Sequence, residues 1–109
     1  MKKAIWLSYD LGFQADYSSL YQWLDTHQAI ECGDSVAFLN LETERPPEEI
    51  PQIIQSELEK IGINNRSKAR VYLVWRDIKG AIRGKFIIGQ RKSPPWAGYA
   101  PKPMTEEVG

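Results

Sequence analysis

The chain has 109 residues, of which 42% are hydrophobic and 11% aromatic, and its 14 Lys and Arg residues balance 14 Asp and Glu residues. This length and composition predict one globular domain and exclude a disordered chain. No apolar run approaches the roughly 20 residues that cross a bilayer, and the apolar stretch after Met1 ends at Ser8, too early for a secretory signal. We therefore expect a cytoplasmic location and no membrane contact.

Charge is distributed unevenly along the chain. Residues 1–59 carry 3 Lys and Arg against 11 Asp and Glu, whereas residues 60–92 carry 10 Lys and Arg against Asp77 alone. This polarity indicates a polyanionic partner or contact between opposite faces of two copies. The alternative is that folding mixes the charges into a neutral surface.

The first half of the chain predicts two strands around a helix. Residues 3–9 are rich in β-forming apolar side chains and predict a central strand that ends at Asp10. Asp16 is a good N-cap for a helix over 16–28, in which Tyr17, Leu20, Tyr21 and Leu24 recur at helical spacing. Residues 31–34 resemble a turn, and residues 35–41 predict the second strand.

The second half predicts a helix followed by a hairpin. Pro47 or Pro51 fits the first turn of this helix, and Gly62 fits the residue just after its end. One face of the helix is a stripe that is polar only at Glu57, formed by Ile50, Ile53, Ile54, Glu57, Leu58 and Ile61. Residues 69–76 and 81–89 predict strands joined by a turn at 77–80. On the last strand, Ile82, Phe86 and Ile88 are expected on one face and Arg83, Lys85 and Ile87 on the other.

The order of elements predicts an α+β domain of the split βαβ (ferredoxin-like) kind over residues 1–92. We expect a four-stranded antiparallel sheet with two helices on one face. The strand at 35–41 could instead be a bent hairpin through 42–45, or the last strand could add to a sheet edge. Residues 93–109 predict a Pro-rich, extended tail that contacts a protein partner, with Trp96 fastening it to the body or to a second subunit.

Asp10 is the first candidate for chemistry, because a carboxylate at the end of a central strand is accessible and held by a rigid element. Such a carboxylate can bind Mg²⁺ through one oxygen while waters and phosphates complete the shell. A symmetric dimer would bring two such carboxylates together. The alternative is that Asp10 simply ends its strand.

A basic cluster on the hairpin is the second candidate. Its members fit phosphate contacts by charge and are Arg76, Lys79, Arg83 and Lys85. Tyr72 and Trp75 could stack on bases, but buried strand aromatics are commoner, so we favour a core role for both. The single cysteine, Cys32, excludes an internal disulfide, and Cys32 with His27 has too few ligands for zinc and no evident orienting acid for a nucleophile.

Four segments together resemble the small CRISPR-associated adaptation proteins and their SinR-like relatives, in the VapD-type nuclease superfamily. They are residues 5–11 (IWLSYDL), 16–21 (DYSSLY), 32–39 (CGDSVAFL) and, more loosely, 69–74 (ARVYLV). The resemblance implies a ferredoxin-like homodimer that packs through its sheets. It also implies that Asp10 is a metal ligand and catalytic residue, supported by Tyr9 and Ser35. The Pro-rich tail and the Gly-rich last strand depart from that pattern.

Three functions follow from these observations. The leading hypothesis is a dimeric DNA- or RNA-binding protein with Mg²⁺-dependent phosphodiester cleavage at Asp10. The second is a non-catalytic scaffold or antitoxin-like interaction protein of the same fold. The third is a small-molecule-sensing regulatory module, since one fold supports many functions.

Overall fold

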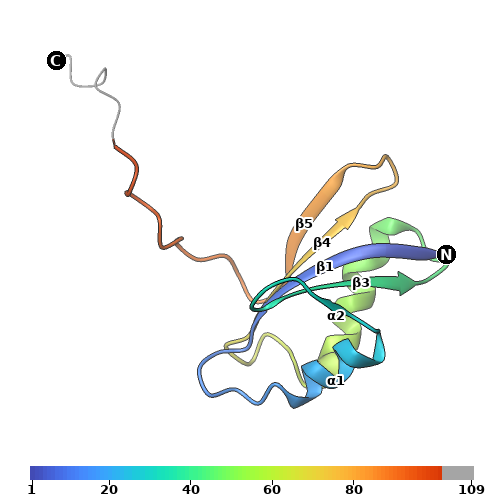
Figure 1. Cartoon of the computed structure of the whole chain (residues 1–109), viewed down its shortest axis with the longest axis horizontal. Coiled ribbons are helices and arrows are strands. Elements are labelled where there is room, and N and C mark those ends of the chain that lie inside the picture. Colours follow the sequence, from blue (N-terminus) through green and yellow to red (C-terminus); the bar gives the residue numbers. More distant parts are fainter. Residues whose placement is uncertain (102–109) are drawn as a thin grey trace.

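The computed structural model describes residues 1–101, which fold into one open antiparallel sheet and two helices (Figure 1). The sheet order is β2-β3-β1-β4-β5. The strands are β1 (Lys2–Asp10), β2 (Ile30–Glu31), β3 (Val36–Glu42), β4 (Arg70–Arg76) and β5 (Ile82–Ile88). The helices are α1 (Ser18–Thr26) and α2 (Ile50–Lys60), and a 3₁₀ turn, η1 (Pro47–Glu49), leads into α2.

The predicted α+β class is confirmed, but the predicted number of four strands is wrong. The additional strand is β2, whose Ile30 and Glu31 pair with Phe38 and Ala37 of β3. Two residues are too few to show the alternation by which a strand is recognised in a sequence. The predicted turn at 31–34 is therefore the connection of a β2–β3 hairpin.

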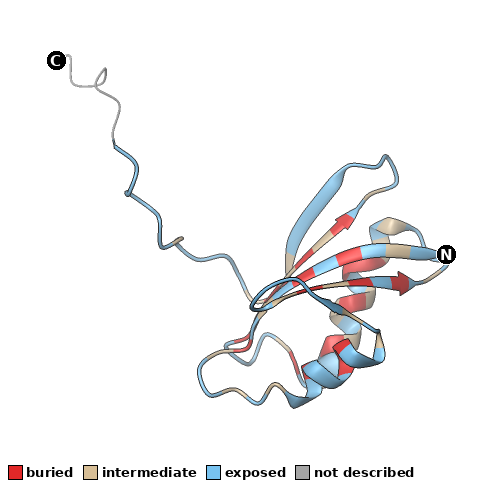
Figure 2. Cartoon of the chain, in the orientation of Figure 1, coloured by how far each residue is buried: buried red, intermediate tan, exposed pale blue. Residues whose placement is uncertain are grey.

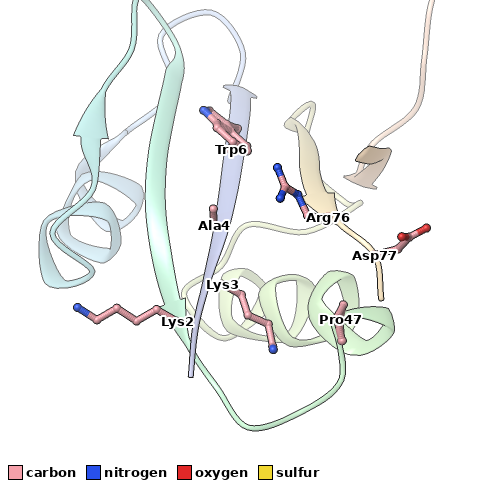
Figure 3. Close-up of a pocket in the computed structure, with 7 residues that line it drawn as sticks. All are labelled: Lys2, Lys3, Ala4, Trp6, Pro47, Arg76 and Asp77. Carbon is pink, nitrogen blue, oxygen red and sulfur yellow. The ribbon is translucent and has the colours of Figure 1, made fainter. Parts of the chain in front are cut away.

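Both helices lie against one face of the sheet (Figures 1 and 3). Alternate strand residues, such as Ile5 and Leu7 of β1, are buried beneath the helices, while their neighbours are more exposed (Figure 2). On the helices, Leu20 and Ile54 are fully buried against the same layer. Within residues 1–101, this two-layer packing leaves the opposite sheet face without a covering element.

The helix starts differ in part from the prediction. Asp16 is not the N-cap of α1, because Tyr17 holds that position and the Asp16 carboxylate instead accepts a 2.8 Å hydrogen bond from the Ser18 N–H. In α2, Pro51 lies in the first turn as predicted. Gly62, just beyond the helix, has a φ of +92°, which a glycine adopts without the strain that a side chain would cause.

A β-bulge changes the faces predicted for β5. Tyr72 pairs with Phe86 but Val71 pairs with Ile88, so that Ile87 is an additional residue in the ladder. Ile87 and Ile88 are both buried, and the prediction that Ile88 shares a face with Phe86 is wrong. Phe86 stays on the uncovered side of the sheet.

Beyond β5, residues 93–101 extend away from the body (Figure 1). The Trp96 side chain is 72% exposed, so its predicted attachment to the body of its own chain is wrong. The rest of the predicted tail, residues 102–109, lies outside the described residues. Within residues 1–101, no helix has both the length and the apolar character needed to span a membrane.

Candidate nucleic-acid interface

We call the sheet surface turned away from the helices the open face. All five strands contribute to it, because alternate residues of each strand point away from the core, and Ile30 of β2 lies on this face opposite Phe38. Its main members are Lys2, Ala4, Trp6, Ser8 and Asp10 of β1, Val36, Phe38, Asn40 and Glu42 of β3, Arg70, Tyr72, Val74 and Arg76 of β4, and Ile82, Gly84 and Phe86 of β5.

An aromatic row crosses the open face with one ring on each of four neighbouring strands. Phe38 and Trp6 are partners across β3 and β1 with ring centroids 5.0 Å apart. Tyr72 and Phe86 are partners across β4 and β5 with centroids 4.8 Å apart. Ser8 is the residue directly opposite Tyr72, so Trp6, two positions earlier in β1, is the diagonal neighbour of Tyr72. Diagonal cross-strand residues lie about 7–8 Å apart, which aromatic side chains can span.

A hollow of about 350 Å³ lies beside Trp6, on the side of the row toward the start of β1 and the end of β4, and we call it the Arg76 hollow. In the described part of the chain, β1 and β4 pair only from Ile5 and Trp75 onward, so no strand flanks the start of β1 on the β4 side and the hollow opens there. Figure 3 shows this hollow, with Trp6 on β1 and Arg76 on β4 among the residues that line it. Its lining residues are Lys2, Lys3, Ala4, Trp6, Pro47, Arg76 and Asp77.

A second, smaller hollow of about 200 Å³ lies on the opposite side of the row, toward the end of β1 and the start of β4, and we call it the Asp10 hollow. Its lining residues are Ser8, Tyr9, Asp10, Arg70, Tyr72, Phe86 and Arg91. The Arg91 guanidinium carbon lies 5.6 Å from the Tyr72 ring centroid and 5.3 Å from that of Phe86. The Arg70 guanidinium carbon lies 5.4 Å from the Phe86 centroid. Cations therefore surround this aromatic pair in cation–π contact.

The predicted basic cluster is divided by the sheet. Arg76 lies on the open face, but Arg83 and Lys85 pair with Trp75 and Leu73, which point into the core side of the sheet. Arg83 also donates through Nε to an Asp77 carboxylate oxygen 2.8 Å away, an ion pair that lowers the pKa of Asp77. Lys79 lies in the turn between β4 and β5.

Tyr72 and Trp75, the two aromatic residues considered for base stacking, lie on opposite faces of the sheet. Trp75 is buried in the core, as favoured from the sequence. Tyr72 is only half-buried on the open face, so the core role favoured for Tyr72 is wrong.

Asp10 is exposed at the end of β1, where its Oδ1 atom accepts a 2.9 Å hydrogen bond from the Gly12 N–H. Tyr9 points to the helix side, and its burial raises the pKa of its phenol. The Ser35 carbonyl accepts a 2.9 Å hydrogen bond from the Tyr9 N–H, so the backbone of Ser35 lies beside the end of β1, and the residue is exposed.

Magnesium is a poor fit to one chain. Within residues 1–101, no three His, Cys, Asp or Glu side chains are grouped to hold a metal ion. Among residues 1–101, Asp10 is the single carboxylate that lines its hollow, and Mg²⁺ sites usually combine one or two carboxylates with substrate phosphates. A metal at Asp10 would therefore need nucleic acid or a second copy to complete its shell.

His27 and Cys32, considered together from the sequence, have separate structural surroundings, and those of His27 are explained by packing. The His27 ring lies 4.4 Å from that of Trp23, and its Nε2 lies 3.3 Å from the Glu57 Oε1 that also accepts the Trp23 indole N–H at 2.8 Å. These contacts join α1 to α2. Cys32 is exposed in the β2–β3 turn, where its thiol makes a weak contact with the Ile30 carbonyl and its N–H donates to the Val36 carbonyl.

Several residues of the open face were not singled out from the sequence, namely Trp6, Phe38, Arg70, Phe86 and Arg91. The alternation of side chains in β1 does predict that Trp6 lies on the other face of the strand from Ile5 and Leu7. However, it does not tell which face the helices leave open, and strands far apart in sequence supply the rest of the row.

Comparisons of the chain with protein-family models, with curated proteins and with solved structures give no match. The resemblance to the CRISPR-associated adaptation proteins therefore stays a prediction.

Proposed function

We propose that this protein binds single-stranded nucleic acid on its open face. The observation that carries the proposal is the aromatic row with basic side chains on both of its sides, in the Arg76 hollow and in the Asp10 hollow. Stacking of one base on an aromatic ring contributes roughly 1–3 kcal/mol and tolerates any base sequence. The basic residues Lys2, Arg70, Arg76 and Arg91 would contact the phosphates, and Glu42, one of the two acids on this face, is engaged by the N-terminal amine at 2.6 Å.

A single strand suits this surface better than a duplex. Duplex bases are already stacked and present only their edges, whereas an open strand can lay its base faces on the rings. The proposal includes the ferredoxin-like plan, supported by the β1-α1-β2-β3-α2-β4 order and the β2-β3-β1-β4 arrangement. A four-stranded sheet with exposed aromatics is a recurrent platform for single-stranded RNA.

Cleavage at Asp10 is a second proposal, supported by the position of this exposed carboxylate in the hollow beside Tyr72 and Phe86. It requires a homodimer or the bound strand to complete a Mg²⁺ shell. Face-to-face pairing of two open faces would oppose their arginines, which costs electrostatic energy. A dimer that leaves the open face free is therefore the form compatible with both proposals.

The test is binding of labelled single-stranded DNA and RNA, and of the matching duplexes, by fluorescence polarisation across a salt series in EDTA. Tighter, salt-sensitive binding of the single strands supports the proposal. If neither single strand binds at low salt, the proposal fails, and a dimer that dissociates on substitution of Trp6 would then make the open face an interface between copies.

Two further measurements separate the alternatives. Products that appear on addition of Mg²⁺ and vanish in Asp10→Ala would support cleavage, whereas binding without products favours a scaffold. A melting temperature raised by a small molecule, without polyanion affinity, would indicate a sensing module instead.

A further inference from the structure

The Asp10 hollow contains an acidic side chain, although a surface that binds only phosphates would need basic side chains alone. Asp10 lines it together with the rings of Tyr72 and Phe86 and with two arginines. A carboxylate next to bound phosphates weakens binding by charge repulsion. Its presence beside a stacking platform therefore calls for a group that it can contact favourably.

We infer that Asp10 reads the edge of a base stacked at Tyr72 and Phe86, and selects guanine over uracil or thymine. This inference rests on the proposed function of the open face. An ionised carboxylate only accepts hydrogen bonds, so it favours bases that present donors. Guanine presents two adjacent donors, its ring N–H and its amino group, which match the two oxygens of one carboxylate.

The other bases match less well. Cytosine and adenine present one amino donor each, and carboxylates accept from such amino groups. Uracil and thymine present one N–H between two carbonyl oxygens, and these oxygens would repel the carboxylate. The expected order of preference is guanine first, then cytosine and adenine, then uracil or thymine.

The carboxylate is held and has acceptor capacity to spare. The Gly12 N–H fixes Oδ1, and Oδ2 has no hydrogen-bond partner within residues 1–101. No Lys or Arg of the described part of the chain forms an ion pair with Asp10, although Arg70 is its cross-strand partner. A base edge is therefore not competing with a protein cation for these oxygens.

The test compares three short uridine oligomers that carry one central guanosine, inosine or uridine, measured in EDTA. Inosine lacks the amino group of guanosine and keeps the ring N–H. For the native chain we expect the guanosine oligomer to bind about 10-fold more tightly than the uridine oligomer, with inosine between them. In Asp10→Asn we expect the preference to fall to about twofold or less and binding of the uridine oligomer to increase.

Glu42→Gln is the matched control, because it removes the same charge from the same face away from the Asp10 hollow. It should leave the guanosine preference unchanged. An unchanged preference in Asp10→Asn, or a preference that requires Mg²⁺, overturns the inference while the proposed function stands. Absence of binding to all three oligomers overturns the proposed function itself.

Discussion

The Tyr72 ring lies directly over Gly84, so that a Cβ added to Gly84 would stand 2.8 Å from the ring atoms Cε2 and Cζ. Gly84 is opposite Val74 on the neighbouring strand, and its lack of a side chain leaves the space that the ring occupies. In this position Tyr72 meets Phe86 edge to face. The glycine in β5 therefore serves to position one half of the aromatic row.

Gly84→Ala should move the Tyr72 ring and weaken single-strand binding several-fold. The free energy of unfolding should change by no more than about 1 kcal/mol, because β5 is an edge strand and alanine suits a strand better than glycine. Polarisation and urea unfolding measure the two effects. Lys85→Ala, next in the strand but on the other face, should leave binding nearly unchanged, and equal losses in both variants would contradict the role of Tyr72.

Trp6→Leu should weaken single-strand binding by about 1–3 kcal/mol through loss of a stacking surface. Trp6 is 36% exposed beside Phe38, so a base can reach its ring. Trp96→Leu is the matched control, since Trp96 is exposed outside the open face. If Trp96→Leu abolishes binding and Trp6→Leu does not, the tail rather than the open face binds the strand.

The salt dependence should distinguish the two faces of the sheet. Each phosphate neutralised on a single strand contributes a slope of about −0.7 to the plot of log K against log salt. Arg70→Gln, Arg76→Gln and Arg91→Gln should each reduce that slope by about this amount. Arg83→Gln and Lys85→Gln remove the same charge from the other face, and larger effects there would restore the hairpin cluster predicted from the sequence.

Elements with long apolar patterns were predictable from the sequence alone. The stripe from Ile50 to Ile61 and the alternation of Val71, Leu73 and Trp75 each report a buried face directly. The two-residue β2 and the bulge at Ile87 were not predictable in the same way. Both depend on hydrogen bonds to a neighbouring strand that leave no periodic signal in the local sequence.

The site was harder to predict than the fold, because it is assembled across strands. Arg76 and Arg83 are close in sequence and equally basic, yet the alternation of the hairpin sends them to opposite faces. Trp6 and Phe38 are 32 positions apart and meet only through the β1–β3 register. Charge and aromatic content therefore suggested nucleic acid as the kind of ligand, whereas strand pairing decides which basic and aromatic residues share a face.

Trp23 and Trp75 should respond differently to substitution by phenylalanine. They are similarly buried, at 8% and 9% exposure, but Trp23 donates its indole N–H to Glu57, whereas the buried Trp75 Nε1 has no partner within residues 1–101. A hydrogen bond to a charged group contributes about 1.5–3 kcal/mol, and an unpaired buried donor is unfavourable. Trp23→Phe should therefore reduce the free energy of unfolding by roughly 2 kcal/mol more than Trp75→Phe does.

Urea unfolding at neutral pH measures this difference. Glu57→Gln keeps an acceptor for Trp23 while removing the charge, and we expect it to fall between the two tryptophan variants. A larger loss in Trp75→Phe would mean that the indole of Trp75 has a hydrogen-bond partner.

Asp77 should make the stability of the β4–β5 hairpin depend on acid pH. Its carboxylate accepts hydrogen bonds from Arg83 and from the N–H groups of Lys79 and Ala81, at 2.8 and 2.9 Å. The bond from Arg83 is the largest cause of a pKa lowered from its ordinary value of 3.8. A group with a lowered folded-state pKa stabilises the fold above its ordinary value and loses this contribution as pH falls through the folded value.

The stability advantage of the native chain over Asp77→Asn should therefore be constant at neutral and mildly acidic pH and shrink below 3.8. Urea midpoints measured through that range test this expectation. Arg83→Gln removes the principal cause of the shift but keeps both backbone hydrogen bonds, so its pH dependence should be intermediate. A difference between the native chain and Asp77→Asn that stays constant to the lowest pH would mean that Asp77 holds the turn by hydrogen-bond geometry alone, because a charge-dependent contribution must disappear once the carboxyl is protonated.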